Sequence, residues 1–254
     1  MKLVQINCWQ GKIAPKLLQF IAREKPDFIT TQEIFDAKRD APVPNRQFDL
    51  GRQIRETSGL INTFFAPRCS VDVADEEKPF GNMIFSRWPF ADQKTIFVSG
   101  HQPIYHMKTS DDSLDIGINL QIVEVKIDDK TLMLANHHGY LARGNGERFG
   151  DEKSEESMRK VAEQLREFAN RPLVLAGDMN VISESATMRA FDGFLHDLTA
   201  ENQIQQTLSP IHWFDQPVAC DHILVNDAVK VQNFAVRKNE LVSDHLPLVL
   251  EFDI

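Results

Sequence analysis

Apolar and polar residues alternate at every second position over much of this chain, a pattern typical of β-strands that bury one face. The clearest run covers residues 118–126, and Asp128 and Asp129 supply a turn into the next strand. Residues 99–115 lack the pattern and are predicted to form a polar loop that carries His101 and His106. Shorter runs predict strands at residues 2–6, 27–31, 61–66, 82–86, 95–98, 131–135, 173–176, 223–225, 229–236 and 246–252.

A second pattern, with apolar residues three and four positions apart, predicts helices. The strongest example begins near Ser154, which is expected to cap the helix, and places Met158, Val161 and Leu165 on one buried face. Other helices are predicted around Ile13, Pro15, Leu17, Phe20 and Ile21, over residues 46–57, and near residues 186–191. Short helices among many strands predict an α/β fold in which two packed sheets are flanked by helices.

Composition is that of an ordinary globular protein, with 254 residues, 42% hydrophobic and 26% charged. Repeats, low-complexity tracts and linkers are missing, so a single domain over residues 1–254 is expected. The three scattered cysteines form neither a zinc motif nor a disulfide framework and are expected to be small buried residues in a reducing compartment. Without a signal peptide or an apolar run of about 18–20 residues, a cytoplasmic location is predicted.

The charge balance concerns the possible partners of the protein. The net charge of −9 comes from 37 acidic and 28 basic side chains, and an acidic chain repels polyphosphates at long range. Extended contact with nucleic acid is therefore less expected than for a basic protein. Bound divalent cations or a local basic patch could reverse this effect at the site itself.

Polar residues of a particular kind fall at the ends of the predicted strands. They are carboxylates, amides and imidazoles, which can meet on one rim of a rigid scaffold: Asn7, Glu33, His138, Asp178, Asn180, Asp221, Asp244 and His245. A hard cation such as Mg²⁺ takes oxygen ligands from carboxylates, water and substrate phosphate. An aspartate can orient or deprotonate water, and imidazoles can donate to phosphoryl oxygens. These residue types fit the hydrolysis of a phosphate ester.

Six short motifs occur in a fixed order at the strand edges, and together they resemble those of the endonuclease/exonuclease/phosphatase superfamily. The motifs are Gln5-Ile6-Asn7, Gln32-Glu33, Asn136-His137-His138, Gly177-Asp178-Met179-Asn180, Cys220-Asp221-His222 and Ser243-Asp244-His245. Residues 81–89 also look like the family's central strand and turn. The resemblance implies a DNase I-like four-layer α/β sandwich, with two packed mixed sheets flanked by helices.

The same resemblance implies roles for the metal site and for catalysis. Glu33 would bind Mg²⁺ or Mn²⁺ with Asn7 beside it, and Asp244 would serve the metal or its water shell. Asp178 would position or activate the attacking water, and Asn180 would hold the phosphate. His245, oriented by Asp221, would contact the phosphoryl oxygens. The fourth catalytic residue would be His138, at the position where DNase-like and sphingomyelinase-like members carry histidine.

Two positions depart from the family's pattern. Trp9 stands where several repair nucleases carry an acidic residue, and His137 stands where a threonine is common. His137 could contact substrate or could be a packed, hydrogen-bonded histidine. Arg143 and Arg148 could bind a substrate anion or could lie in an exposed loop. His222 is expected on a strand surface, outside the catalytic set.

The resulting hypothesis is a divalent-metal-dependent phosphohydrolase acting on a small molecule or a lipid headgroup. The alternative is a DNA or RNA nuclease of the same superfamily, which would need a basic groove with aromatic residues that stack on bases. Candidates for such a groove are Lys12, Arg87, Arg143 and Arg148, with Trp88 and Trp213. An inactive interaction protein of this fold is less expected, because every motif position is filled.

Overall fold

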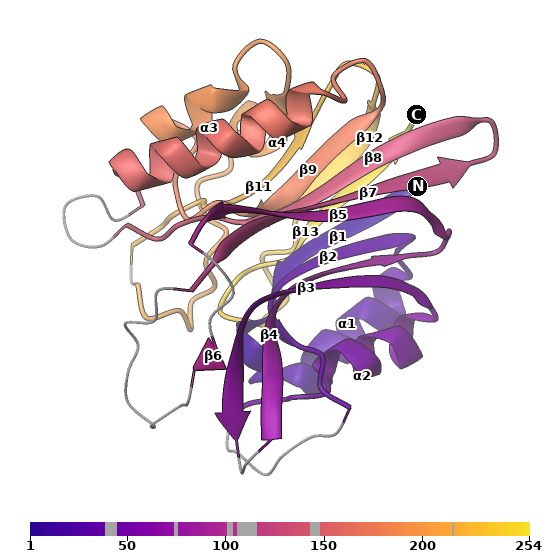
Figure 1. Cartoon of the computed structure of the whole chain (residues 1–254), viewed down its shortest axis with the longest axis vertical. Coiled ribbons are helices and arrows are strands. Elements are labelled where there is room, and N and C mark those ends of the chain that lie inside the picture. The colour runs from indigo at the N-terminus through magenta and orange to yellow at the C-terminus, as the bar shows by residue number, and fades with distance from the viewer. Residues whose placement is uncertain (39–44, 74–75, 101–103, 106–115, 143–147, 215) are drawn as a thin grey trace.

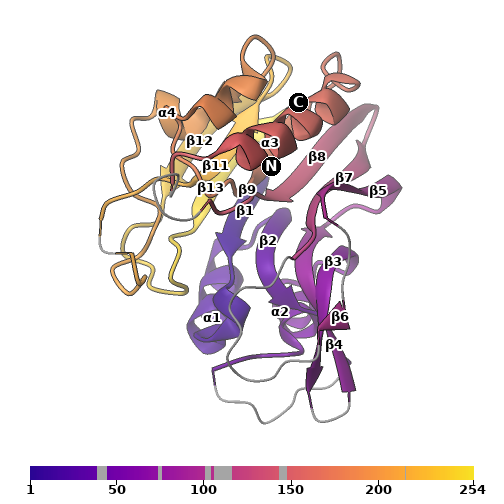
Figure 2. The same cartoon turned by 60° about the vertical axis from the view of Figure 1, so that its left-hand side comes forward.

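Two β-sheets packed face to face form the centre of the protein, with helices on both outer faces (Figure 1). The structure is a computed structural model, and it describes residues 1–38, 45–73, 76–100, 104–105, 116–142, 148–214 and 216–254. This architecture confirms the predicted α/β sandwich. Figure 2 shows the two sheets from the side, with their helices on opposite outer faces.

The first sheet has seven strands in the order β12-β13-β1-β2-β4-β3-β6. It is mixed, because β1 pairs in parallel with β2 and antiparallel with β13. Its strands in chain order are β1 (Lys2–Asn7), β2 (Phe28–Phe35), β3 (Asn62–Val73), β4 (Glu76–Ser86), β6 (Ile104–Tyr105), β12 (Lys230–Val236) and β13 (Leu248–Asp253).

The second sheet has six strands in the order β10-β11-β9-β8-β7-β5. It is also mixed, since β8 pairs in parallel with β9 and antiparallel with β7. Its strands are β5 (Phe90–Ser99), β7 (Ile118–Ile127), β8 (Lys130–His138), β9 (Leu173–Asp178), β10 (His196–Asp197) and β11 (Asp221–Val225).

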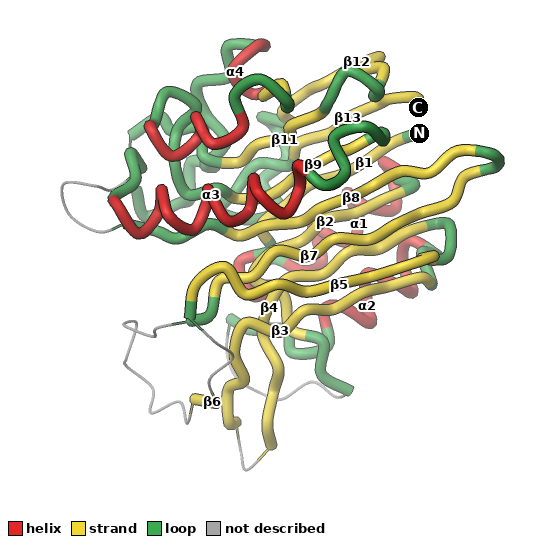
Figure 3. The backbone as a smooth tube through the Cα atoms, turned by 45° about the horizontal axis from the view of Figure 1, so that its top comes forward, coloured by secondary structure: helices red, strands yellow, loops and turns green. Residues whose placement is uncertain are grey.

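Three apolar layers hold the sheets and helices together. Helices α1 (Ala14–Glu24) and α2 (Leu50–Ser58) pack on the first sheet, and α3 (Glu152–Arg166) and the 3-10 helix Ala186–Phe191 pack on the second. A third layer fills the space between the sheets. The alternation of each strand explains this division: in β1, Leu3 faces the other sheet while Val4 faces the helices. Figure 3 shows the same layers, together with α4 (Leu198–Glu201).

The helix boundaries differ from the predicted ones in two places. Helix α3 is capped by Asp151 and not by Ser154, because the Asp151 carboxylate accepts a hydrogen bond from the Ser154 amide. Helix α2 begins at Leu50, later than the predicted residue 46, and ends at Ser58, one residue beyond the predicted end. The predicted loop 99–115, including His101 and His106, falls mostly outside the described residues.

Strand β3 is the largest correction among the strands, because it continues seven residues beyond the predicted end at residue 66. Its register with β4 shifts between Pro67 and Cys69, which makes Arg68 the extra residue of a β-bulge. Gly81 lies opposite the bulge, where an added Cβ would be 2.1 Å from the Ala66 carbonyl oxygen. The bulge therefore requires a glycine on the partner strand.

Buried amides connect the two sheets below the strand ends. Gln5 donates to Gln32, Gln32 donates to Asn136, and Asn136 donates to Gln121, over distances of 2.7–2.9 Å. All four side chains are fully buried. The interface between the sheets is thus apolar along most of its length and polar at one end.

The three cysteines are free and buried, as predicted. Among the described residues, the helices are too short or too polar to cross a bilayer.

Candidate active site

A cavity of about 550 Å³ opens at the polar end of the two sheets. Most of the predicted site residues line it. From the predicted set these are Glu33, His138, Arg148, Asp178, Asn180, Asp244 and His245. Trp9, Gln10, Arg68, Tyr140, Lys153, His212 and Trp213 are among the other lining residues.

Strand pairing brings the central residues together. Asp178 is the last residue of β9, and its register partners are His138 on β8 and Asp221 on β11. Residues separated by 40 or more positions in sequence therefore become neighbours across one edge of the sheet. His245 approaches from the other sheet, just before β13.

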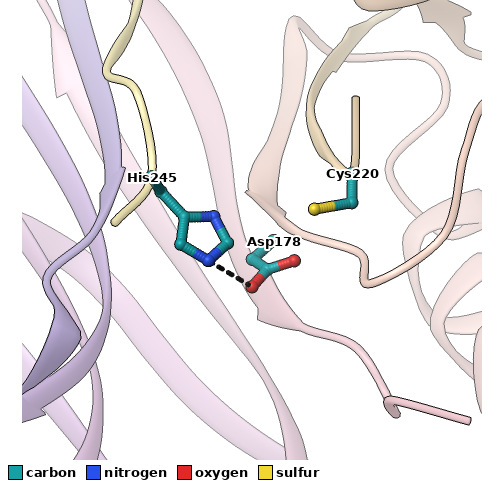
Figure 4. A group of neighbouring side chains, drawn as sticks. All are labelled: Asp178, Cys220 and His245. Atoms are coloured by element: carbon teal, nitrogen blue, oxygen red, sulfur yellow. Dashed lines mark ion pairs between the residues drawn. The ribbon is translucent and has the colours of Figure 1, made fainter. Parts of the chain in front are cut away.

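The Asp178 carboxylate is the centre of this arrangement. Its Oδ1 accepts the Asn180 backbone N–H at 2.9 Å, and its Oδ2 accepts the Asn7 amide at 3.1 Å. The Nε2 atoms of His138 and His245 lie 3.5 and 3.8 Å from the same Oδ2. Figure 4 shows His245 directed at this carboxylate. Oδ1 thus supports the local turn, and Oδ2 faces the imidazoles of His138 and His245.

His245 is held in its charged form. Its Nδ1 lies 2.8 Å from Oδ2 of Asp221, which also accepts the Thr207 hydroxyl at 2.7 Å. Burial alone would lower the pKa of His245, but the carboxylates of Asp221 and Asp178 outweigh it and raise the pKa to about 10. Burial would likewise raise the pKa of Asp178, yet the His245 cation holds it well below its usual range.

His138 has a very different neighbour. Its Nδ1 lies 2.5 Å from an Nη atom of Arg68, a residue that the sequence patterns missed. Burial, and after it the Arg68 guanidinium, hold the pKa of His138 well below 6.5. A neutral imidazole and a charged one therefore face the same oxygen of Asp178.

Two further carboxylates line the cavity. Burial, and then the nearby Asp244, raise the pKa of Glu33 to about 7, and burial also raises the pKa of Asp244. Glu33 sits at the β2 bulge with φ +52°, a backbone conformation that non-glycine residues adopt rarely. A partly buried acid, Glu33, and a buried acid, Asp244, repel each other and form an oxygen-donor set that a hard divalent cation would fit.

Two other groups of ligand-type atoms lie close together, and both fit a metal poorly. They are Asp178–Cys220–His245 and His212–Asp244–His245. The carboxylates of Asp221 and Asp178 raise the pKa of His245, so a proton competes with a metal for its Nε2, and burial holds the pKa of the Cys220 thiol well above its usual value. The oxygen atoms of Glu33 and Asp244 are therefore the better candidates.

Arg148 and Asn180 form a second polar contact at the cavity. Arg148 is only 3% exposed, and its guanidinium donates to the Asn180 Oδ1 at 2.7 Å. Asn180 in turn donates from Nδ2 to the Gly139 carbonyl at 3.1 Å. The expected exposed loop at Arg148 is therefore wrong, while Arg143 lies outside the described residues.

Two histidines have purely internal contacts. For His137 these contacts fit the packed alternative and not the substrate contact, and for His222 they correct the expected position on a strand surface. His137 is 0% exposed, and its Nδ1 donates to the Asn119 carbonyl at 3.0 Å, so it does not line the cavity. His222 is buried and not on a strand surface, because its two ring nitrogens meet Asp197 Oδ2 and the Val181 carbonyl at 3.0 and 2.8 Å.

Asn7, expected beside the metal, does not line the cavity. Its Nδ2 donates to Asp178, and its Oδ1 accepts the Trp9 N–H at 3.1 Å. The structure places it as a support for Asp178, next to Glu33.

The rim of the cavity is aromatic and partly basic. Trp213 is 67% exposed, Lys12 lies 3.9 Å above the Trp9 ring, and His212 packs edge-on against His245. Loop residues without periodicity supply most of this rim, so hydrophobic patterning gave no signal for it. Of the residues considered for a nucleic-acid groove, Arg87 instead pairs with Asp27, and Trp88 packs against Phe28.

The sequence profile of the Endonuclease/Exonuclease/phosphatase family matches residues 4–245. This range includes every predicted catalytic and metal-site residue, from Asn7 to His245. The chain belongs to this family. A comparison with functionally curated protein sequences gives no match.

Solved structures of this family have the same fold at low sequence identity. An endonuclease/exonuclease/phosphatase family protein from Bacteroides thetaiotaomicron is 18% identical, with a TM-score of 0.72 over 100% of this chain and 98% of that one. A mannosyl-6-phosphatase from the same species is 18% identical, with a TM-score of 0.67 and full coverage of both chains. TDP2 from D. rerio, complexed with a single-strand DNA product, is 15% identical, with a TM-score of 0.68 over 100% and 99%.

Proposed function

We propose that this family member is a divalent-metal-dependent hydrolase of small phosphate esters. The observation that carries the proposal is the placement of Asp178 Oδ2, which the Nε2 atoms of His138 and His245 approach within 3.5 and 3.8 Å beside the acids Glu33 and Asp244. Donors on two sides and a cation site on the third suit a phosphoryl group in the cavity.

In this proposal Asp178 orients the attacking water. The charged His245 keeps the pKa of Asp178 low, so the carboxylate is a weak base that accepts a hydrogen bond from water as the water attacks phosphorus. The ester P–O bond breaks on the opposite side. The attacking water loses one proton to solvent, and the leaving oxygen takes up one proton from solvent. His245 and His138 donate from Nε2 to the non-bridging oxygens, whose charge grows in the transition state.

Glu33 and Asp244 would hold Mg²⁺ or Mn²⁺, with Asn7 supporting Glu33 and Asp178. A bound cation supplies charge stabilisation for the phosphoryl and leaving oxygens. Asn180 has one amide hydrogen left after its bond to Gly139, and this hydrogen can bind phosphate.

A small ester suits the shape of the site better than a nucleic acid does. The cavity is a pocket of about 550 Å³, within the usual range for small-molecule sites. The net charge of −9 also disfavours long phosphate-binding surfaces. The relative named as a mannosyl-6-phosphatase supports sugar phosphates as one class to test.

Nuclease activity is the second candidate, and the rim favours it. Trp213 is an exposed ring that could stack on a base, and Lys12, Arg148 and Lys153 lie around the same cavity. The relative TDP2 carries a DNA product. Plasmid DNA and single-stranded DNA therefore belong in the same assay.

The test is a substrate panel assayed with Mg²⁺, with Mn²⁺ and with EDTA. Its members are p-nitrophenyl phosphate, bis-p-nitrophenyl phosphate, mannose 6-phosphate, sphingomyelin, plasmid DNA and single-stranded DNA. We expect cleavage of a small ester, loss in EDTA and recovery with added metal.

Asp178→Asn should reduce kcat by about 10²–10⁴-fold, the scale of losing an acid–base or orienting group. Asp129→Asn, the same change at an exposed turn, is the matched control and should keep full activity. Full activity in chelated enzyme would contradict metal dependence. Plasmid cleavage that exceeds small-ester hydrolysis and disappears in Asp178→Asn would give the nuclease hypothesis first place.

A further inference from the structure

Arg68 occupies an unusual place for an arginine. It is the extra residue of the β3 bulge, which turns its side chain out of the strand's alternation and into the space under His138. Arg68 is 7% exposed, and its Nε donates to the Gly117 carbonyl at 2.8 Å. One Nη reaches Nδ1 of His138 at 2.5 Å. The bulge and the Gly117 contact together fix the position of this Nη.

The chemistry of the contact determines where His138 carries its proton. A guanidinium offers only donors, and it remains protonated at neutral pH. Nδ1 of His138 must therefore accept through its lone pair, which leaves the ring proton on Nε2. A charged imidazole would direct an Nδ1–H at the guanidinium. The charged and titratable groups around His138 are Arg68, Asp178, His245 and His137.

We propose that Arg68 is a positioning residue that fixes His138 as the neutral tautomer with its proton on Nε2. The Nε2–H then lies 3.5 Å from Asp178 Oδ2 and faces the cavity, where it donates to a phosphoryl oxygen of the substrate. In this state His138 presents only a donor to the cavity, and it cannot remove a proton from water there. This role in catalysis rests on the proposed phosphoesterase function, whereas the tautomer itself does not.

The experiment compares three substitutions at one position. Arg68→Lys keeps a charged donor, Arg68→Met keeps the length but removes the donor, and Arg68→Glu offers an acceptor in place of a donor. Arg87→Met, at an exposed arginine that pairs with Asp27, is the matched control. Melting temperatures establish which variants fold, and if Arg68→Glu does not fold, the Lys and Met variants decide the result.

Nitrogen-15 long-range correlation spectra give a readout that does not depend on activity. The His138 signal is the one missing from His138→Gln. We expect an Nε2–H tautomer in the wild type, in Arg68→Lys and in Arg87→Met. A mixture is expected in Arg68→Met, and a proton on Nδ1 in Arg68→Glu.

Activity on the best substrate of the panel supplies the second readout. Arg68→Glu should lower kcat by about 10²-fold, because it turns the Nε2 donor into an acceptor, and Arg68→Met, with its mixed tautomers, by roughly 10-fold or less. KM should change only a few-fold in both, and Arg68→Lys should restore most of the loss. A wild-type His138 that is charged, or that carries its proton on Nδ1, overturns the proposal whatever the activity. An unchanged spectrum in Arg68→Met also overturns it. A rise in KM at constant kcat shows instead that Arg68 binds substrate.

If no phosphate ester is cleaved, the spectra still decide the role of Arg68. Failure of the proposed function and failure of this inference are therefore distinguishable.

Discussion

His138 and His245 face the same oxygen of Asp178, and their neighbours force them into opposite proton states. Behind His245 lies Asp221, whose buried carboxylate favours the imidazolium. Behind His138 lies Arg68, whose buried guanidinium disfavours the imidazolium form of His138. Both rings are nearly inaccessible to solvent, so burial does not explain the difference. The group that contacts Nδ1 sets the proton state of each ring. As a result, only His245 brings a positive charge to the cavity.

The largest effect is expected from removing the charge behind His245. Asp221→Asn keeps the size of the side chain but no longer balances the imidazolium, so His245 becomes neutral because burial disfavours its charge. We expect kcat to fall by about 10²–10⁴-fold. Steady-state kinetics on the best panel substrate is the measurement.

A second buried histidine–carboxylate pair provides the control for this change. His222 and Asp197 have the same chemistry but do not line the cavity. Asp197→Asn should lower the melting temperature and leave kcat of the folded enzyme within a few-fold of wild type. Equal losses of kcat in both variants would mean that general destabilisation, and not the proton state of His245, causes the defect.

A smaller and asymmetric effect is expected when each catalytic histidine is replaced by glutamine. The glutamine amide is a neutral donor, so it can replace a neutral imidazole but not a charged one. His245→Gln should therefore lower kcat by about 10²-fold or more, and His138→Gln by roughly 10-fold or less. The ratio of the two kcat values is the measurement. A larger loss of kcat in His138→Gln than in His245→Gln would mean that His138, and not His245, is the charged histidine.

The smallest effect concerns stability and a third buried histidine, His137. His137 is buried and neutral with its proton on Nδ1, and burial lowers its pKa to about 4. A lowered folded-state pKa contributes stability that is present above the unfolded-state value near 6.5 and is lost as the pH falls toward 4. Between pH 7 and pH 5, His137 should account for about 2 kcal/mol of lost stability.

Urea unfolding in EDTA at both pH values tests this prediction. His137→Gln should lose about 2 kcal/mol less than wild type over the same interval. An identical pH dependence in the two proteins would show that His137 is not the responsible group.

The sequence predicted most of the centre of the site because its residues end strands with clear patterns. Asp178 and His138 follow strong apolar runs, and pairing of β8 with β9 places them side by side. The family motifs added Glu33 and His245, which come from the other sheet. Patterning alone could not have joined the two sheets at this point, because it carries no information on strand order.

Arg68 was missed for a physical reason. Pro67 and Arg68 interrupt the alternation of β3, so the pattern predicts that the strand ends at residue 66, and a bulge produces the same interruption without ending the strand. His212, in a loop without periodicity, was not predicted for the site, although its ring packs against His245. In both cases the position depends on contacts with distant segments, which local periodicity does not record.

The row of buried amides between the sheets has a consequence for how faithfully the chain selects one arrangement during folding. A strand that slips by two residues keeps its apolar side chains facing the right way, so hydrophobic burial barely distinguishes the slipped form. The same slip would separate Gln5, Gln32 and Asn136 from their partners. Each unsatisfied buried amide group costs about 1–3 kcal/mol. These amides therefore supply much of the free-energy gap between the native alignment and its nearest competitors, at the end of the molecule where alignment determines activity.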